Sequence, residues 1–455
     1  MSLAKMPPEI FCEILSLLPP KVLLTCLTVS RAWHGTILRS PALQYVIRLW
    51  KDGLVPGDPG SSSSTDMLRE LDRRRQAWAN LDWTSQTVVE ILDTNTAESV
   101  VQRQGLGIDA ENLEDFTLDP AQDLIASFHQ SCPGQGTLVF QTLSGRQHHP
   151  MARCPMISFP IDRDMRVLLY TQIAGDVVGA AIFEGGYCTL RLWNWHTGDC
   201  LARLPQCDSP YPESQFLSPR ALVQSVPTHN GRIEIYTIKA DQIGVSSVIQ
   251  VASLHLPALD DDYDLEFIEM HAGPTCPQPM PRRPFSSAYT RRIYMFHLRY
   301  ITDDGSLQPR LFVPHRTLDS YVSRYDQERL TAPLDVPWED WGPQNTRMLP
   351  GDEYSWAGHV HGERVVLPAD DAGKKCMNLL DFRPIVPGQP EFAQSRAPDT
   401  RTSFVSSPTT INEPFENPVT TSLPYRSTFR HMDENFDVLL LDQDHIIGVN
   451  SKKAT

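Results

Sequence analysis

The sequence has no long hydrophobic run. No segment reaches the roughly 18 uninterrupted apolar residues that a membrane-spanning helix needs, so we expect no membrane helix. The apolar N-terminus is broken by Glu9, Glu13 and a proline pair, and no small-residue cleavage site follows it. Because a signal peptide needs an apolar core and such a site, we expect no secretory signal and no membrane partner.

Cysteine is present, but it lacks the spacing of a zinc or redox site. The nine thiols are scattered and odd in number, and no two of them form a C-x-x-C pair. In a chain without a secretory signal, such thiols are expected to be reduced, in the cytoplasm or the nucleus. These residues are Cys12, Cys26, Cys132, Cys154, Cys188, Cys200, Cys207, Cys276 and Cys376.

Motifs of common catalytic sites are missing as well. There is no G-x-x-x-x-G-K-[ST] phosphate loop and no G-x-S-x-G nucleophile elbow. Residues 105–107, Gly-Leu-Gly, lack the third glycine and the following helix of a dinucleotide site. We therefore predict no catalytic residue, no cofactor and a non-enzymatic role.

Two histidine pairs and one acidic segment are the candidates for metal binding. His359-Val360-His361 puts two imidazoles on one side of a strand near Glu363, but a third defined ligand is missing, so we interpret it as a solvent-facing strand. His148-His149 has poorer geometry, with rings on opposite faces of a strand or in a loop. The five carboxylates in residues 260–266 lack the glycine-centred loop of a calcium site. We interpret them as a solvated acidic loop that would attract a basic substrate, and we predict no metal site.

Basic residues are fewer than acidic residues, 40 against 55. The net charge is −15 and the pI is about 5.4. The first 55 residues hold six Lys/Arg and three Asp/Glu, which gives +3 and leaves −18 for the remainder. Such an acidic body argues against nucleic acid or an anionic membrane as the main partner.

Apolar residues are concentrated at the start of the chain. Of the first 50 residues, 28 are apolar, against 41% for the whole chain. Proline pairs at 7–8 and 19–20 and the N-cap candidate Ser30 divide residues 6–50 into three helices, and Ser40-Pro41 ends the third before a final apolar turn. A unit this small rarely buries all of its apolar surface, so we expect it to dock on the rest of the chain or to present an apolar face to a partner.

This head of the chain resembles an F-box. The family pattern is Leu-Pro-x-Glu-Ile, a proline-containing turn, an apolar second helix and Val-Ser-Arg-x-Trp. The chain has Met6-Pro7-Pro8-Glu9-Ile10, Pro19-Pro20, Leu23-Leu24 and Val29-Ser30-Arg31-Ala32-Trp33, with methionine as the single departure.

The resemblance implies that the head binds a Skp-type adaptor and through it a cullin–RING ubiquitin ligase. The residues that it implies for the adaptor-facing surface are Pro7, Pro8, Ile10, Phe11, Ile14, Leu15, Leu18, Leu23, Leu24, Val29 and Trp33. An ordinary helical cap packed on its own domain is the alternative interpretation.

A linker and one more helix follow the predicted F-box of residues 1–54. The Pro/Gly/Ser-rich residues 55–65 are expected to form a mobile linker. A connecting helix is predicted over residues 66–83, and we expect it to dock on the large domain and fix its angle to the F-box. We interpret its basic run, Arg73-Arg74-Arg75, as a solvated helix face.

Residues 84–450 consist of short β-type runs separated by Gly, Pro and Asp, such as the run at 87–92, and they lack long helical periodicity. Two segments look like copies. Asp123-Leu124-Ile125-Ala126 and Asp176-Val177-Val178-Gly179 are 53 residues apart, and each precedes a Thr-Leu strand that ends near a glycine turn. The chain end, 442–448, echoes the same strand and would complete a blade begun near the start of this domain.

The second copy, residues 190–201, resembles the outer hairpin of a WD-type blade, which implies a β-propeller. A repeat of about 52 residues divides the 367 residues into seven blades, with six or eight left open. The predicted fold class is therefore α+β multidomain: a small all-α F-box of three helices, then a mainly all-β, propeller-like domain, with a tail at 451–455.

Two further runs, Trp338-Glu339-Asp340-Trp341-Gly342-Pro343 and Leu423-Pro424-Tyr425-Arg426, look like recurring features of fungal F-box proteins with propeller-like C-terminal halves. We interpret them as aromatic anchors at blade edges and a proline-fixed loop. The implied function is a substrate receptor of an SCF-type ligase that holds an unknown protein target. An adaptor-bound scaffold without degradative function and an enzyme built on the propeller remain open, and the substrate-binding residues are unknown.

Overall fold

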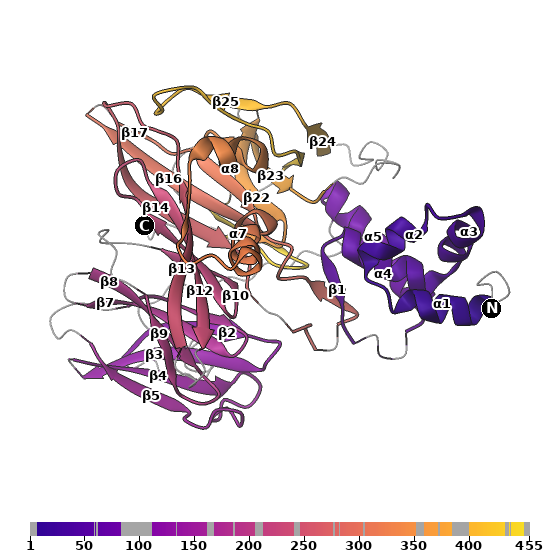
Figure 1. Ribbon diagram of the computed structural model, residues 1–455, viewed down its shortest axis with the longest axis horizontal. Coiled ribbons are helices and arrows are strands. Elements are labelled where there is room, and N and C mark those ends of the chain that lie inside the picture. The colour runs from indigo at the N-terminus through magenta and orange to yellow at the C-terminus, as the bar shows by residue number, and fades with distance from the viewer. Residues whose placement is uncertain are drawn as a thin grey trace.

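A helical module and a larger β-domain make up the computed structural model (Figure 1). The predicted strand at 87–92 and the tail at 451–455 lie outside the residues that the structure describes. The described residues are 7–58, 60, 62–82, 112–132, 134–161, 168–184, 187–204, 213–240, 246–275, 278–281, 283–303, 305–351, 359–371, 374–384, 400–432, 436 and 438–449.

The helical module contains the three predicted helices and a fourth. Prolines occupy the first turn of α1 and of α2, where their missing N–H groups cost nothing, and the Ser30 hydroxyl accepts the Trp33 N–H at 3.2 Å at the start of α3. The predicted final apolar turn is instead an eleven-residue helix. Ser40 is its N-cap and Pro41 its first residue, so this pair begins a new helix as well as ending the third. The helices are α1 (Pro8–Ser16), α2 (Pro20–Cys26), α3 (Arg31–Arg39) and α4 (Pro41–Lys51).

Strand β1 (Leu54–Pro56) and helix α5 (Ser64–Asn80) join the module to the β-domain. Strand β1 pairs antiparallel with β15 (Phe285–Ser287), so the first two residues of the predicted linker lie in a sheet. Near the C-terminal end of α5, Trp78 packs against Met377 and Leu439 in an apolar cluster of the β-domain. The expected docking of the connecting helix is thereby confirmed.

The β-domain contains five mainly antiparallel sheets of four or five strands in the described residues, and successive sheets follow one another along the chain. The first three sheets are formed by β2 (Leu113–Asp119), β3 (Leu124–Cys132), β4 (Gln135–Thr142) and β5 (Met156–Pro160); β6 (Leu168–Ala174), β7 (Val177–Glu184), β8 (Tyr187–Asn194) and β9 (Cys200–Arg203); and β10 (Ser214–Ser218), β11 (Ala221–Val226), β12 (Arg232–Ala240) and β13 (Ser246–His255), with β19 (Leu334–Val336) added in parallel to β13.

The fourth and fifth sheets are less regular, because helices and short strands are inserted between their strands. They are formed by β14 (Asp264–Ala272), β16 (Ile293–Thr302), β17 (Gly305–Leu307), β18 (Arg310–Pro314) and β20 (Arg347–Leu349); and by β21 (Val360–His361), β22 (Arg364–Asp371), β23 (Lys374–Asp381), β24 (Thr400–Val405) and β27 (Tyr425–His431). Two hairpins complete the domain, β25 (Thr409–Ile411) with β26 (Val419–Thr421), and β28 (Val438–Leu441) with β29 (Ile446–Val449).

The sheets resemble propeller blades in the way they pack. Neighbouring sheets touch through their first strands, β2 with β6, β6 with β10, β10 with β14 and β14 with β21. Apolar cores fill the spaces between the sheets; one joins Phe140 of the first sheet to Val178 and Trp193 of the second. Five such sheets lie in the described part of the chain, so the count of seven blades stays a prediction.

The two copies seen in the sequence occupy equivalent places. Asp123 and Asp176 immediately precede β3 and β7, the second strands of successive sheets. Trp195, fully buried at the end of β8, donates its Nε1–H to the Gly175 carbonyl at 2.9 Å and ties the turn to the strand. Residues 442–448 lie in the β28–β29 hairpin, and in the described residues these two strands pair with each other alone.

Two helices interrupt the β-domain, α7 (His315–Glu328) and α8 (Trp338–Asn345). The prediction that residues 84–450 lack long helical periodicity is therefore wrong for α7, which has 14 residues. Its buried stripe of Leu318, Tyr321, Val322 and Tyr325 follows the i, i+3, i+4, i+7 spacing of a helix and packs on the core. Short β-type runs on either side concealed this signal.

Trp341 of α8 anchors that helix on the third sheet. Its ring is fully buried, and its Nε1–H donates to the His255 carbonyl of β13 at 2.8 Å. We expect Trp341→Phe to lower the free energy of unfolding by about 2 kcal/mol, because the carbonyl loses its donor and the core loses volume. Urea unfolding measures this. Trp338→Phe, whose ring is held by packing, should cost less, and equal costs would contradict the role of the hydrogen bond.

Glu213 gives the β-domain a pH-dependent stability. Burial raises the pKa of this carboxyl to about 7, and Glu269 adds to the rise; the Met270 N–H that donates to it at 2.5 Å and the nearby His271 oppose it. The pKa of Glu213 in the folded state lies above the usual 4.5. The contribution of this carboxyl to the free energy of unfolding is therefore fully present below pH 4.5 and is lost as the pH rises through about 7.

In Glu213→Gln we expect the decrease in the free energy of unfolding over this pH range to be smaller by about 3 kcal/mol. The reason is that glutamine cannot ionise, while its carbonyl oxygen still accepts the Met270 N–H. Denaturant unfolding over this pH range measures the effect, with the exposed Glu114→Gln as the control. A pH dependence unchanged in Glu213→Gln would show that another group is responsible.

Candidate functional site

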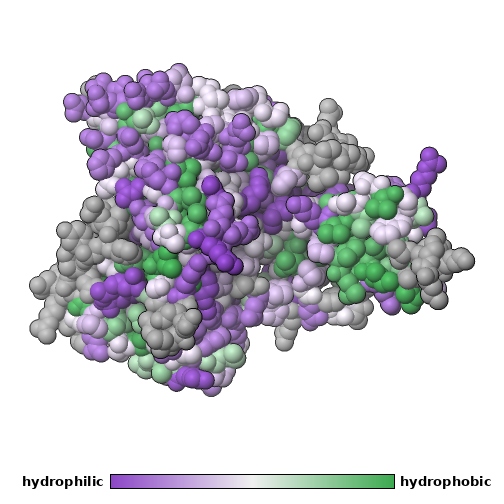
Figure 2. All heavy atoms as spheres, in the orientation of Figure 1, coloured by the Kyte–Doolittle hydropathy of each residue, from purple (hydrophilic) through white to green (hydrophobic). Residues whose placement is uncertain are grey.

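Large apolar side chains lie exposed on the helical module. Figure 2 shows them as green spheres over the module. On α1, Ile10, Ile14 and Leu17 follow the i, i+4, i+7 spacing of one helical face and are 46%, 40% and 83% exposed. Val22 of α2, Val29 between α2 and α3, and Leu38 of α3 are exposed as well. An apolar surface this concentrated on a small module is typical of a protein-binding face.

The residues predicted to face an adaptor divide into exposed, half-buried and buried groups. Ile10, Ile14, Val29 and Pro7 are exposed, whereas Leu18, Leu24 and Trp33 are half-buried. Of Pro8 the structure describes only the backbone, at the first position of α1.

Phe11, Leu15 and Leu23 are buried in the module's own core, where Phe11 meets the edge of Trp33 with ring centroids 4.9 Å apart. The prediction that these three side chains lie on the outward surface is therefore corrected. They hold the helices together, because α1 turns one stripe inward and another outward.

The opposite side of the module is sealed against the β-domain. Tyr45 and Leu49 of α4 are buried with Leu54, Leu71 of α5 and Phe285 of β15 in one apolar cluster. The Tyr45 hydroxyl also donates to the Pro284 carbonyl at 2.8 Å. In Figure 1, α1 and α3 lie on the side of the module away from the sheets. The exposed apolar face therefore points away from the β-domain.

Buried charges fix the angle of the module. The Asp52 carboxylate, at the end of α4, accepts from Arg75 of α5 at 2.9 Å and from Arg383 at 3.3 Å, just after β23. Arg74 donates to the Gln443 carbonyl at 2.7 Å and pairs with Asp444. The interpretation of residues 73–75 as a solvated face is thus wrong for Arg74 and Arg75, which are buried, and it is confirmed for Arg73.

A comparison with known protein families decides what the module is. Residues 3–43 match the family model described as F-box-like. The chain has an F-box-like domain at its N-terminus. No curated protein matches the sequence.

Among solved structures, WD40 and other β-propeller domains are distantly similar to this chain. The Cps50 (Swd1) β-propeller domain of Myceliophteria thermophila is 9% identical, with 62% of this chain and 70% of that chain covered and a TM-score of 0.32. The C-terminal WD40 domain of Sif2 is 8% identical, with 70% and 96% covered and a TM-score of 0.22.

Hsv2 of Kluyveromyces lactis is 10% identical, with 32% of this chain covered and a TM-score of 0.25. The chain spans about half the length of two of the Kluyveromyces lactis structures that it matches.

The sequence signals weighed as metal sites have structural roles in the β-domain. His359 is buried, with Nδ1 2.6 Å from the Leu439 carbonyl, and His361 lies 3.1 Å from the Ser287 hydroxyl. The interpretation of this strand as solvent-facing is therefore wrong. Burial lowers the pKa of His361 to about 4, so this imidazole is neutral at pH 7.

The remaining candidates behave differently. His149 is buried edge-on against Trp195. The aspartates at 260–262 form an exposed loop, as predicted, whereas Asp264 and Glu266 of the predicted loop lie in strand β14. No group of three His, Cys, Asp or Glu side chains in the described part of the chain is placed to hold a metal ion. Six cysteines in that part form no disulfide, and no helix there is long and apolar enough to cross a membrane.

Sequence reasoning missed three exposed residues of the F-box-like domain, Leu17, Val22 and Leu38. The signal for Leu17 was available, because it continues the helical face of Ile10 and Ile14 by one turn. Val22 and Leu38 carried no such signal. Their exposure depends on how α2 and α3 rotate against α1, which local spacing does not determine.

Proposed function

We propose that this protein is the substrate-recognition subunit of an SCF-type cullin–RING ubiquitin ligase. The F-box-like domain binds a Skp-type adaptor, and through it a cullin, while the β-domain holds a protein target. The observation that carries the proposal is the apolar stripe of Ile10, Ile14 and Leu17, which is exposed on the F-box-like domain and turned away from the β-domain. Burying such a stripe against a partner is the main source of affinity in protein interfaces.

In this proposal the chain performs no bond-making step. It raises the effective concentration of the target beside the ubiquitin-charged enzyme. The joint between the two parts supports this role, because β1, α5 and the ion pairs of Asp52 connect the F-box-like domain to the β-domain at several points. A fixed angle holds a bound target at a reproducible distance from the ligase. The proposed location is the cytoplasm or the nucleus.

Co-purification of the full chain with a Skp-type adaptor and a cullin tests the first half of the proposal. Ubiquitin-remnant proteomics with and without the chain tests the second half. We expect a stable complex and at least one protein that loses its ubiquitin remnants and accumulates when the chain is deleted. Adaptor binding without any stabilised protein would favour a non-degradative scaffold, and failure to bind the adaptor would refute the proposal.

A further inference from the structure

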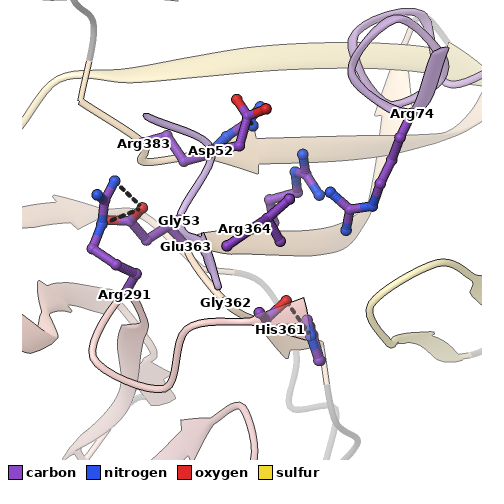
Figure 3. A pocket seen from close by; sticks show the side chains of 11 residues that line it. Asp52, Gly53, Arg74, Arg291, His361, Gly362, Glu363, Arg364 and Arg383 are labelled. Carbon is purple, nitrogen blue, oxygen red and sulfur yellow. Dashed lines mark hydrogen bonds and ion pairs between the residues drawn. The ribbon is translucent and has the colours of Figure 1, made fainter. Parts of the chain in front are cut away.

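A small, partly open cavity lined by charged side chains lies at the joint between the F-box-like domain and the β-domain (Figure 3). Its volume is about 20 Å³, enough for one occupant of the size of a water molecule. Four arginines and two carboxylates line it: Arg74, Arg291, Arg364, Arg383, Asp52 and Glu363.

Ion pairs around the cavity form three groups, and each group has one more guanidinium than carboxylate. Glu363 is shared by Arg291 at 2.7 Å and Arg316 at 3.8 Å. Asp444 is shared by Arg74 and Arg283.

In the third group, two carboxylates serve three arginines. Arg75 and Arg383 both contact Asp52, and Arg383 and Arg364 both contact Asp381, the latter at 3.4 Å. The three groups together place seven arginines on four carboxylates, in a chain whose overall charge is −15.

The excess positive charge is largely out of water. The side chains of Arg74, Arg75, Arg364 and Arg383 are buried. Burial and the neighbouring Arg383 lower the pKa of Arg74 to about 10, and they lower the pKa of Arg364 as well. Uncompensated buried charge is costly, so this arrangement favours any anion small enough to enter.

Two of these arginines point toward each other. In Figure 3, Arg74 extends from α5, and its guanidinium lies beside that of Arg364 on β22. Arg364 stacks over the Trp78 ring of α5 at 4.5 Å and has Nε on Asp381. One guanidinium group thus comes from the connecting helix α5 and the other from the β-domain.

We propose that this cavity binds a halide-sized inorganic anion, chloride, between Arg74 and Arg364. The anion compensates the surplus guanidinium charge and bridges α5 to β22, so it stabilises the joint. A cavity of about 20 Å³ has room for a monoatomic anion. The inference concerns the joint itself and does not depend on ligase activity.

Thermal unfolding of the full chain tests the proposal at a constant ionic strength of ~0.15 M, with chloride exchanged for the bulkier gluconate. We expect chloride to raise the Tm by about 2 °C with a saturable dependence on concentration. Arg364→Met should abolish this chloride-specific increment. The matched control Arg324→Met, which removes an exposed ion-paired arginine of α7, should keep it.

Crystals of the unmodified chain soaked in bromide provide a direct measurement that needs no variant. We expect an anomalous difference peak between Arg74 and Arg364. Equal Tm values in chloride and gluconate, a full chloride increment in Arg364→Met, or a cavity without a bromide peak would each overturn the proposal. Stabilisation by phosphate alone would also overturn it, because the occupant would then be larger than a halide.

Discussion

Adaptor binding is expected to weaken about 100-fold or more when Ile10 and Ile14 are both replaced by aspartate, while the fold is retained. Both side chains are exposed on one face of α1, so two carboxylates there remain solvated in the free protein. In a complex they would be buried in an apolar interface without partners, and that desolvation removes most of the binding energy. Titration of the purified chain with the adaptor measures the loss.

Two control variants make this prediction specific. Met151→Asp changes an apolar side chain of the β-domain that is 59% exposed, and it should leave adaptor binding unchanged. Leu15→Ala acts differently, because Leu15 is 1% exposed in the module core, and it should lower the thermal stability. Wild-type affinity in the Ile10→Asp/Ile14→Asp variant would show that the adaptor uses another surface.

Asp52→Ala is expected to lower the free energy of unfolding by about 4 kcal/mol, with the loss concentrated at the joint. The carboxylate is buried and serves Arg75 at 2.9 Å and Arg383 at 3.3 Å. Its removal leaves two buried guanidinium groups with less compensation, in a cluster that already has a surplus of positive charge. Denaturant unfolding measures the total, and hydrogen exchange of α4, β1 and α5 locates the loss.

Asp326→Ala is the matched control for Asp52. Asp326 pairs with Lys239 at 2.6 Å, but both side chains are half in water, so the expected cost is below about 1 kcal/mol. Equal destabilisation by the two variants would mean that burial of the Asp52 cluster does not matter. An unchanged rate of hydrogen exchange at the joint in Asp52→Ala would mean that Asp52 does not hold the F-box-like domain in place.

The helices of the F-box-like domain were predictable because their signals are local. Proline pairs and the Ser30 cap act within one turn of the chain, so they work the same way in any tertiary setting. The same reasoning failed at residues 41–51, where Ser40-Pro41 was interpreted as a break although a proline can equally open a helix. A serine followed by a proline is found both where helices end and where they begin.

The helix that carries the exposed apolar face of the F-box-like domain was predictable, but the residues that form this face were only partly predictable. The resemblance to an F-box placed much of this face on the first helix, yet Phe11 and Leu15 proved to be core while Leu17 proved to be the most exposed large apolar residue of the described chain. An apolar helix offers two stripes, and the packing of α3 and α4 decides which stripe is covered. The number of blades could not be predicted either. Only two copies of the repeat were clear in the sequence, and the later sheets contain inserted helices.

By itself, the sequence determined the division into an apolar helical head and a β-rich body, the repeat in the first two sheets and the similarity to an F-box, all of which depend on spacing between near neighbours. Only the tertiary structure decided which apolar side chains face outward and where the surplus arginines gather. The physical reason is that burial and charge pairing join residues far apart in the chain. Asp52 meets Arg383, which lies 331 positions away.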